Sequence, residues 1–300
     1  MSASRVEDAI IAEARRLGFA TAGFAAAGIA KGAAGSMDYL HRHAPLRRHP
    51  SFVSPSVVSI VAMVARYPVN PAPQAGGFCM TARTADYHDV LRRKLRLLAD
   101  FIKAHTPVRT LRICVDSAPL PEREWALRAG IGWQGRQGQI ISPLVGACSV
   151  LGFLLVDIPF APSPPMQNQC GGCHRCVDHC PSRAIEADRL IDARRCASYL
   201  SIEHRGDFTD AQQQHLGKAL FGCDICTAVC PWNDRATAPV MQELCATSEP
   251  PNAEELLQLT PETFASRFTG TAVMRSGLNR LQRNAAALTL DILKKQNQSV

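Results

Sequence analysis

The chain has 300 residues, a length that accommodates two domains, or one large domain with an attached module. Hydrophobic residues make up 46% of it and charged residues 20%, which excludes an intrinsically disordered protein and indicates a globular one with a packed core. The formal net charge of +7 assigns no partner by itself, because many enzymes carry as much.

Neither a signal peptide nor a membrane-spanning helix is expected. Glu7 and Asp8 stand where a signal peptide needs a basic start followed by a long apolar run. The longest apolar stretches, residues 57–65 and 150–158, are too short to cross a bilayer as a helix. We therefore expect a cytoplasmic protein with no membrane partner, and a monomer.

The first predicted element is an amphipathic helix that ends at Gly18. Ser4 as N-cap and Glu7 three residues later form a capping-box pattern. The residues predicted to face the core are Val6, Ile10 and Leu17.

Strands and helices then alternate to about residue 160. Residues 56–65 predict a buried strand, 87–104 a long helix, 111–116 a strand that ends at Asp116, and 125–129 a short helix. The apolar stripe of the long helix consists of Val90, Leu91, Leu95, Leu98 and Ile102. This alternation predicts an α/β or α+β core domain.

A proline-rich connector at residues 159–169 marks the first predicted domain boundary. The cysteine-rich segment follows and runs to about residue 233. Helical patterns at residues 252–259 and 278–295 come after it.

Eight of the twelve cysteines lie between Cys170 and Cys230, which indicates metal binding rather than disulfides in a reducing compartment. The spacing of the first run and the proline after it are typical of half of a bacterial [4Fe–4S] ferredoxin. That run is Cys170, Cys173, Cys176 and Cys180, followed by Pro181. A second set is Cys223, Cys226 and Cys230, followed by Pro231.

In two-cluster ferredoxins the cysteine before the proline binds the other cluster, so the two sets exchange ligands. Cluster one is then predicted to have Cys170, Cys173, Cys176 and Cys230. Cluster two has Cys180, Cys223 and Cys226 and lacks one ligand, for which Cys196 is the nearest candidate. The alternative is a pair of structural zinc sites, although zinc sites usually bring cysteines in separated pairs. We expect the other cysteines to be ordinary buried thiols; they are Cys79, Cys114, Cys148 and Cys245.

Asp116 is a candidate proton donor, because it follows a predicted strand beside a loop rich in proline and glycine. The alternative is a turn-forming aspartate. Arg123 is expected either to pair with it, to bind an anionic ligand or to lie on the surface. The glycines at 130–138 do not form a dinucleotide fingerprint, and no phosphate-binding Walker loop is present in the sequence.

The C-terminal segment is basic. Residues 263–300 carry six basic side chains against Asp291, a net charge of +5. The six are Arg267, Arg275, Arg280, Arg283, Lys294 and Lys295. This predicts a surface for a polyanion such as nucleic acid, with a solvated helix face as the alternative.

Together these motifs resemble the epoxyqueuosine reductase family over most of the chain. The resemblance rests on "VDSAPLPERE", "AGIGWQGRQG", "CGGCHRCVDHCP", "DARRCASYLSIEHRG", "FGCDICTAVCPWN" and "LQRNAA", and extends to "MDYLHRH" and "DYHDVL". It implies a cobalamin-dependent enzyme that removes the epoxide oxygen of epoxyqueuosine in tRNA, giving queuosine. Two [4Fe–4S] clusters and an external electron donor would supply its electrons.

The resemblance also implies an α+β fold with three parts. These are a cobalamin-binding α/β core domain with the catalytic residue (1–160), a ferredoxin-like two-cluster domain (161–236) and a short, basic, HEAT-like helical segment (237–300) that helps to hold tRNA.

By the same resemblance Asp116 is the proton donor, and Cys196 joins the cluster ligands. The implied cobalamin contacts are Arg42, Cys79, Asp116, Ile140, Ser198, Ser201, Cys223 and Asp224. Tyr87 and Arg123 would lie near the active site. His204 and Arg205 would be part of the cofactor wall or buried structural groups.

Asp86, Tyr87 and His88 begin the DxHxxG pattern in which a histidine binds cobalt, but Leu91 replaces its glycine, so we reject that motif. The segments "GWQGRQ" and "GACSVLGF" depart from the usual family pattern, and the chain ends soon after "LQRNAAALTLDILKK". A rival function is a corrinoid and iron–sulfur reductase of a small molecule, similar to a reductive dehalogenase. A third is a non-catalytic electron-transfer protein.

Overall fold

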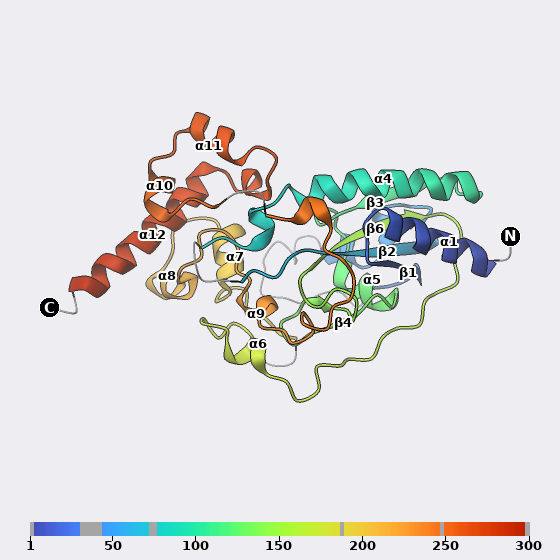
Figure 1. The fold of residues 1–300 in the computed structure, drawn as a ribbon, viewed down its shortest axis with the longest axis horizontal. Helices are drawn as coiled ribbons and strands as arrows, with labels where there is room; N and C mark the ends of the chain where they lie inside the picture. Colours follow the sequence, from blue (N-terminus) through green and yellow to red (C-terminus); the bar gives the residue numbers. More distant parts are fainter. Residues whose placement is uncertain (1–2, 31–43, 72–76, 187–188, 247–248, 298–300) are drawn as a thin grey trace.

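A four-stranded sheet forms the centre of the N-terminal half. The computed structural model describes residues 3–30, 44–71, 77–186, 189–246 and 249–297 (Figure 1). The strand order is β1 (Thr21–Ala26), β2 (Ser59–Arg66), β6 (Ser149–Val156) and β3 (Leu111–Cys114), and every neighbouring pair is antiparallel. A small hairpin pairs β4 (Trp133–Gln134) with β5 (Ile140–Ile141).

The mixed helix-and-sheet fold agrees with the sequence prediction, with one correction. An α/β core implies parallel strands, whereas this core is α+β. The cause is that all three neighbouring pairs of strands are antiparallel, including β3, which joins the edge of the sheet beside β6. The expected three-part arrangement stays a prediction.

Both faces of β2 are buried, which explains its continuous apolar run. Val61, Met63 and Ala65 face a core shared with α1 (Ala3–Arg16) and α4 (Tyr87–His105). The alternate residues Ile60, Ala62 and Val64 face a second core with α5 (Glu122–Arg128). This follows from the two-residue side-chain period of a strand.

The two long N-terminal helices match their predicted positions. All five stripe residues of α4 are buried, and Asp86 caps this helix by accepting a hydrogen bond from His88 N. The predicted capping box of α1 is wrong, because the helix already includes Ala3 and so Ser4 is not its N-cap. Glu7 instead accepts a hydrogen bond from Ala161 N at 2.9 Å.

The proline-rich connector is fixed to the N-terminal half. Phe160 N donates to Ser59 Oγ, and the rings of Phe160 and Phe24 pack at 5.2 Å. Ser163 N donates to Phe24 O, and Phe24 N donates to Ser163 Oγ. The connector therefore completes the outer edge of β1 rather than acting as a loose linker.

The cysteine-bearing segment contains short helices with matching positions in its two halves. Cys176 lies in α6 (Arg175–Asp178) and Cys226 in α9 (Ile225–Ala228), and these two helices pack together. Between them lie α7 (Ala197–Ile202), with Cys196 as its N-cap, and α8 (Asp210–Leu216).

The C-terminal helices pack on a segment from the N-terminal half. They are α10 (Ala253–Leu257), α11 (Pro261–Phe268) and α12 (Leu278–Asn297), which lie away from the sheet in Figure 1. Phe78, between β2 and α4, stacks on Phe221 and on Phe268, with ring centroids 6.4 and 6.2 Å apart. Met241 and Leu244, conversely, belong to the N-terminal core, so packing crosses the predicted boundary at residue 236.

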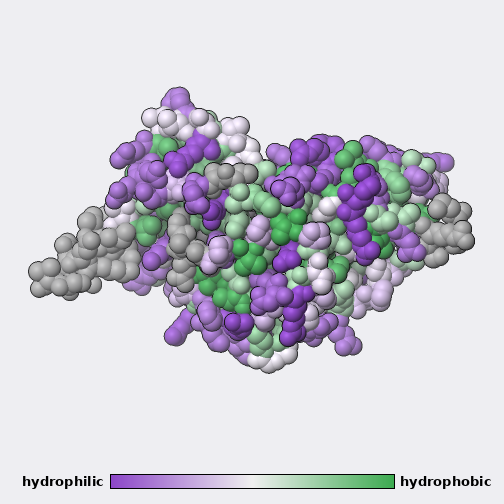
Figure 2. Space-filling model, in the orientation of Figure 1, coloured by the Kyte–Doolittle hydropathy of each residue, from purple (hydrophilic) through white to green (hydrophobic). Residues whose placement is uncertain are grey.

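The remaining short helices are α3 (Ala44–Arg47), η1 (Pro50–Phe52), η2 (Met80–Ala82), η3 (Gln242–Leu244) and η4 (Ala272–Arg275). Polar side chains cover most of the surface over α4 in Figure 2. Within the described residues, no helix has the length and apolar character needed to cross a membrane.

Candidate functional site

Asp116 lies two residues beyond β3, in a strained turn. Its backbone φ is +55°, in the left-handed region that residues with a Cβ rarely adopt. Its N–H donates to Glu122 Oε1 at 2.6 Å, which holds the turn against α5. The Asp116 side chain is 62% exposed, so its carboxylate is accessible to a substrate.

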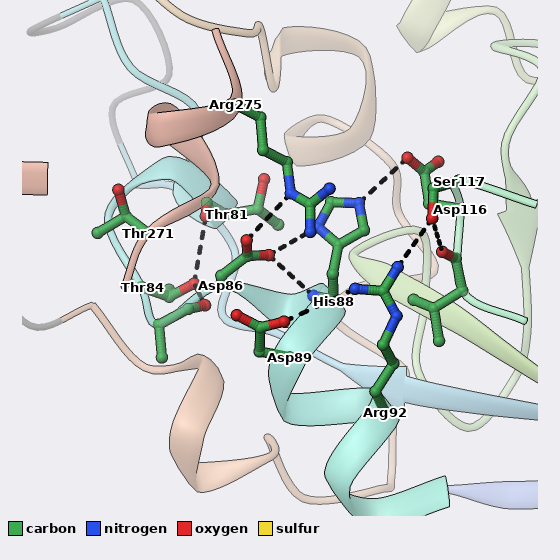
Figure 3. Close-up of polar contacts among 12 residues, drawn as sticks. Thr81, Thr84, Asp86, His88, Asp89, Arg92, Asp116, Ser117, Thr271 and Arg275 are labelled. Carbon is green, nitrogen blue, oxygen red and sulfur yellow. Dashed lines mark hydrogen bonds and ion pairs between the residues drawn. The ribbon is translucent and has the colours of Figure 1, made fainter. Parts of the chain in front are cut away.

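His88 connects Asp116 to the start of α4 (Figure 3). His88 Nε2 lies 3.1 Å from Asp116 Oδ2, and His88 Nδ1 lies 2.6 Å from Asp86 Oδ1. The His88 side chain is only 5% exposed. The imidazole therefore bridges a buried carboxylate and an accessible one.

A residue of the C-terminal segment completes this row of side chains. Arg275, at the end of η4, donates from Nε to Asp86 Oδ2 at 3.1 Å. The Asp86 N–H donates to Gly270 O at 2.7 Å. Arg275, Asp86, His88 and Asp116 thus form one continuous chain of polar contacts, drawn in Figure 3.

These contacts set the protonation of the site. Burial raises the pKa of Asp86, but hydrogen bonds from His88 and Arg275 outweigh it and hold that pKa at about 2. Burial lowers the pKa of His88, but Asp116 and Asp86 outweigh it, and the net shift is upward. Burial, and next the charge of Asp116, raises the pKa of Glu122 to about 8.

Tyr87 and Arg123 are both expected near the active site, and of the two Tyr87 lies beside this row. The Tyr87 ring stacks on His88 with centroids 4.0 Å apart, and burial raises the pKa of the Tyr87 hydroxyl far above its usual value. Arg123, in α5, donates to Gly138 O at 2.9 Å, which ties that helix to the glycine-rich loop.

The four cysteines assigned to cluster one surround a single hollow. Cys170, Cys173, Cys176 and Cys230 line it together with Trp232, and its empty volume, partly open to solvent, is about 350 Å³. Burial, and then the other three thiols, raises the pKa of Cys230 to about 11. The crossing of Cys230 to the first run thus agrees in position with the predicted exchange of ligands.

Gln137 and Arg136 support a cluster in this hollow. Gln137 lines it and is 4% exposed, and neither amide atom has a hydrogen-bond partner among the described residues. A buried amide without partners is unfavourable, whereas the sulfur atoms of a cluster would accept its N–H. Arg136 donates to Cys173 O at 3.1 Å and Gly171 O at 2.9 Å, which places positive charge beside the first loop.

The cysteines assigned to cluster two are also brought together. Burial raises the pKa of Cys226, and the thiols of Cys223, Cys196 and Cys180 add to the increase because they lie nearby. Cys196 therefore lies with the three other predicted ligands. All twelve cysteines are free thiols, and the described residues include no group of His, Cys, Asp or Glu closed around one metal ion.

Three of the implied cobalamin contacts lie side by side next to cluster two. Cys79 N donates to Phe221 O, and a Cβ on Gly222 would collide with Cys79 Sγ. Buried Asp224 accepts from Met80 N at 2.5 Å and Asn70 Nδ2 at 3.1 Å, and burial raises its pKa. A redox cofactor touching Cys79, Cys223 and Asp224 would be adjacent to cluster two, which fits electron transfer from the cluster.

The other implied contacts differ in their accessibility. Ser201 is fully buried, and its Oγ donates to Ala197 O and accepts from Gly222 N, so it also anchors α7. Ser198 is half-buried and Ile140 is 3% exposed. Arg42 lies outside the described residues. A cobalamin contact by any of them stays a prediction.

Four of the six C-terminal basic residues bind other parts of the protein. Arg283 donates to Leu200 O, His204 O and Gly206 O and packs over the Phe208 ring, and burial lowers its pKa to about 10. Arg280 donates to Ile202 O. Arg275 pairs with Asp86, and Arg267 with Glu255. Arg280 and Arg283 therefore help to satisfy the last carbonyls of α7, and the polyanion surface expected from charge stays a prediction.

His204 is half-buried and its ring stacks on Phe208, whereas Arg205 is exposed. Arg205 is therefore not a buried structural group. The side chains of Lys294 and Lys295 lie outside the described part of the chain.

Sequence reasoning missed the roles of His88, Asp86 and Arg275. Asp86 and His88 were named as part of "DYHDVL" and as an incomplete cobalt-binding motif, without a role of their own. Asp86 is a typical N-cap residue, and it stands two residues before His88. This spacing could have predicted that the two side chains lie together at the start of the helix. Arg275 carried no such signal, because its partner lies 189 residues earlier.

Two family models match the chain. Residues 47–117 match "Epoxyqueuosine reductase QueG, DUF1730", and residues 169–233 match "4Fe-4S double cluster binding domain". The second match spans all eight cysteines assigned to the clusters and favours clusters over the zinc alternative.

Curated relatives and solved structures agree with these matches. The chain is 36% identical to epoxyqueuosine reductase of Escherichia coli (strain K12) over 84% of this chain and 69% of the relative. It is 35% identical to that of Alicycliphilus denitrificans over 91% and 83%. A crystal structure of epoxyqueuosine reductase with an epoxyqueuosine-modified tRNA-Tyr stem loop superposes with a TM-score of 0.82 at 29% identity, over 96% of this chain and 81% of that one. The Bacillus subtilis enzyme, solved with the catalytic loop of an aspartate swung out of the active site, has a TM-score of 0.80 at 28% identity over 96% and 82%.

Proposed function

The chain belongs to the epoxyqueuosine reductase family, and on that premise we propose that it removes the epoxide oxygen of epoxyqueuosine in tRNA to give queuosine. The observation that carries the proposal is the pairing of Asp116, at the position of the family's proton donor, with His88 at 3.1 Å. Asp116 is accessible and His88 is buried, as expected for a proton donor backed by a proton reservoir.

The cofactors follow from the same premise. Cobalamin would supply a reduced cobalt centre that opens the epoxide, with two [4Fe–4S] clusters as the source of its electrons. We assign cluster one to Cys170, Cys173, Cys176 and Cys230, and cluster two to Cys180, Cys196, Cys223 and Cys226. Cys79, Cys223 and Asp224 would contact cobalamin, which the hydrogen bonds between their two segments support.

The residues of the site have distinct tasks in this reaction. Conversion of an epoxide to an alkene breaks both carbon–oxygen bonds and releases water, which consumes two electrons and two protons. Asp116 delivers a proton from its carboxyl group to the departing oxygen. His88, protonated between two carboxylates, returns a proton from Nε2 to Asp116 Oδ2, while Asp86 retains the proton on Nδ1.

The experiment that tests this function uses anaerobically purified protein with both clusters, cobalamin and a strong reductant. It is incubated with epoxyqueuosine-containing tRNA, and the nucleosides are identified by mass spectrometry. Loss of one oxygen mass in wild type, and not in Asp116→Asn, supports the proposal. Unchanged tRNA beside reduced cobalamin would contradict the substrate and leave reduction of a small molecule.

A further inference from the structure

Asp86 is held by the C-terminal segment through both its backbone and its side chain. Its N–H donates to Gly270 O at 2.7 Å, and its Oδ2 accepts from Arg275 Nε at 3.1 Å. Gly270 precedes the short helix η4 and Arg275 is its last residue. This helix packs against η2, just ahead of Asp86 in the chain. We call Arg275, Asp86, His88 and Asp116 the catalytic row. Three of these residues belong to the N-terminal half, and the first, Arg275, belongs to the C-terminal half (Figure 3).

The two oxygens of the Asp86 carboxylate have separate partners. Oδ2 accepts a hydrogen bond from Arg275, and Oδ1 is hydrogen-bonded to Nδ1 and to the backbone N–H of His88. The carboxylate is only 7% exposed, so little water is available to replace a missing partner. Loss of Arg275 would free Oδ2 and allow the carboxyl group to rotate, which weakens the hydrogen bond to Nδ1.

The hydrogen bond between Asp86 and His88 Nδ1 sets the ring orientation of His88 and so the position of Nε2 relative to Asp116. A proton held on Nδ1 by Asp86 orients the ring and directs Nε2 at Asp116 Oδ2. A donor and acceptor that shift by a fraction of an ångström transfer protons more slowly. The contact of Arg275 with this row of side chains is with Asp86, so an effect of Arg275 on His88 passes through Asp86.

We propose that Arg275 is a positioning residue for proton delivery, which makes turnover depend on the C-terminal segment being seated against Asp86. The reaction itself rests on the proposed function, whereas the effect of Arg275 on His88 does not. The packing of η4 does not require the guanidinium, because buried Val273 holds this helix against the apolar cluster around Phe268.

The test compares Arg275→Gln and Arg275→Lys with Lys94→Gln. Lys94 also joins α4 to the C-terminal half, through Glu243 at 2.8 Å, but lies outside the catalytic row. The first measurement is the pKa of His88 in cofactor-loaded protein without tRNA, from the pH dependence of hydrogen exchange at the C2 position of its ring, followed by mass spectrometry. The charged and titratable groups around His88 are Asp86, Tyr87, Asp116, Glu122 and Arg275.

We expect the pKa of His88 to be raised in wild type and Lys94→Gln, to rise further in Arg275→Gln, because the full charge of Asp86 then acts on His88 without a neighbouring cation, and to be largely restored in Arg275→Lys. An unchanged pKa in Arg275→Gln would overturn the proposal, with or without activity toward tRNA. Because this readout needs no substrate, a wrong substrate assignment and a wrong role for Arg275 remain distinguishable.

The second measurement is kinetic. Arg275→Gln should lower kcat about tenfold, through misplacement of His88, while KM for tRNA changes less than about twofold. In an Asp86→Asn background the same substitution should have almost no further effect, since the two residues act in series. A change confined to KM, or an equal loss of kcat in both backgrounds, would show that Arg275 acts on tRNA binding or on general stability instead.

Discussion

His88 Nε2 lies 3.1 Å from Asp116 Oδ2, so the exposed carboxylate of Asp116 is paired with a buried imidazole. The other ring nitrogen, Nδ1, is hydrogen-bonded to the carboxylate of Asp86. In the proposed reaction this arrangement separates Asp116, which would meet the substrate, from His88, which would return a proton to it. The consequences can be tested one residue at a time.

Asp116→Asn should abolish proton delivery without disturbing the cofactors. An amide keeps the shape of the carboxyl group but transfers no proton, so turnover should fall about 10²- to 10⁴-fold. Iron content and cobalamin binding should match wild type, as measured by iron analysis and absorption spectra. Full activity in the Asp116→Asn variant would remove Asp116 from the mechanism.

The stabilising effect of His88 should depend on pH. Because its pKa is raised in the folded protein, protonated His88 contributes stability that is fully present below its ordinary pKa of 6.5 and lost as pH rises through the raised value. The gap in urea midpoint between wild type and His88→Gln should therefore shrink as the pH rises above 6.5 and through the raised pKa. A gap that stays constant over that range would contradict the assigned charge of His88.

Cys196→Ala should lose about half of the cluster iron, because cluster two would lose its fourth thiolate. Cys245→Ala is the matched control, since Cys245 is a free thiol outside both cysteine sets. Iron content and the electron paramagnetic resonance of the reduced clusters are the measurements. Full retention of iron in Cys196→Ala would exclude Cys196 as a ligand.

Gln137→Leu should lower the reduction potential of cluster one. A hydrogen bond donated to cluster sulfur stabilises the more negative, reduced state, so its loss favours the oxidised state. A tenfold change in the reduction equilibrium corresponds to about 59 mV for a one-electron couple, which a redox titration resolves. Gln134→Leu is the control, because Gln134 donates to Gly138 O instead. Equal potentials in wild type and Gln137→Leu would show that the amide does not bond to the cluster.

Arg283→Met should act on stability more than on tRNA binding. The variant keeps the apolar contact with Phe208 but removes hydrogen bonds to three carbonyls near the end of α7, which should cost about 1–3 kcal/mol. The expected result is a lower Tm with little change in Kd for tRNA. An unchanged Tm with a higher Kd for tRNA would show instead that Arg283 contributes to a surface that binds nucleic acid.

The sequence predicted best where the signal is local. The apolar stripe of α4 and the buried run of β2 each reflect a short-range period, and both elements appear close to their expected bounds. The cysteine spacing likewise sorted the thiols into two sets that the structure brings together. β1 was missed, because "TAGFAA" consists mostly of small residues and has no strand pattern of its own.

Long-range partners were beyond the sequence for a physical reason. The charge of Arg280 and Arg283 suggested a surface for nucleic acid, because a charge count does not show which backbone carbonyls lack partners. The connector likewise looked like a linker, since prolines disfavour regular structure, although its backbone hydrogen-bonds to β1. These outcomes depend on which distant segments meet in the folded chain.

The segment between β2 and α4 has partners that are synthesised much later than the segment itself. Phe78 stacks on Phe221 and Phe268, and Asp86 takes its last partner from Arg275, 189 residues later in the chain. During synthesis the sheet and most of α4 can form while the ribosome is still translating the cysteine segment. The contacts of Asp86 with Gly270 and Arg275 must wait for almost the whole chain, so a protein released early would carry a folded sheet without these two contacts.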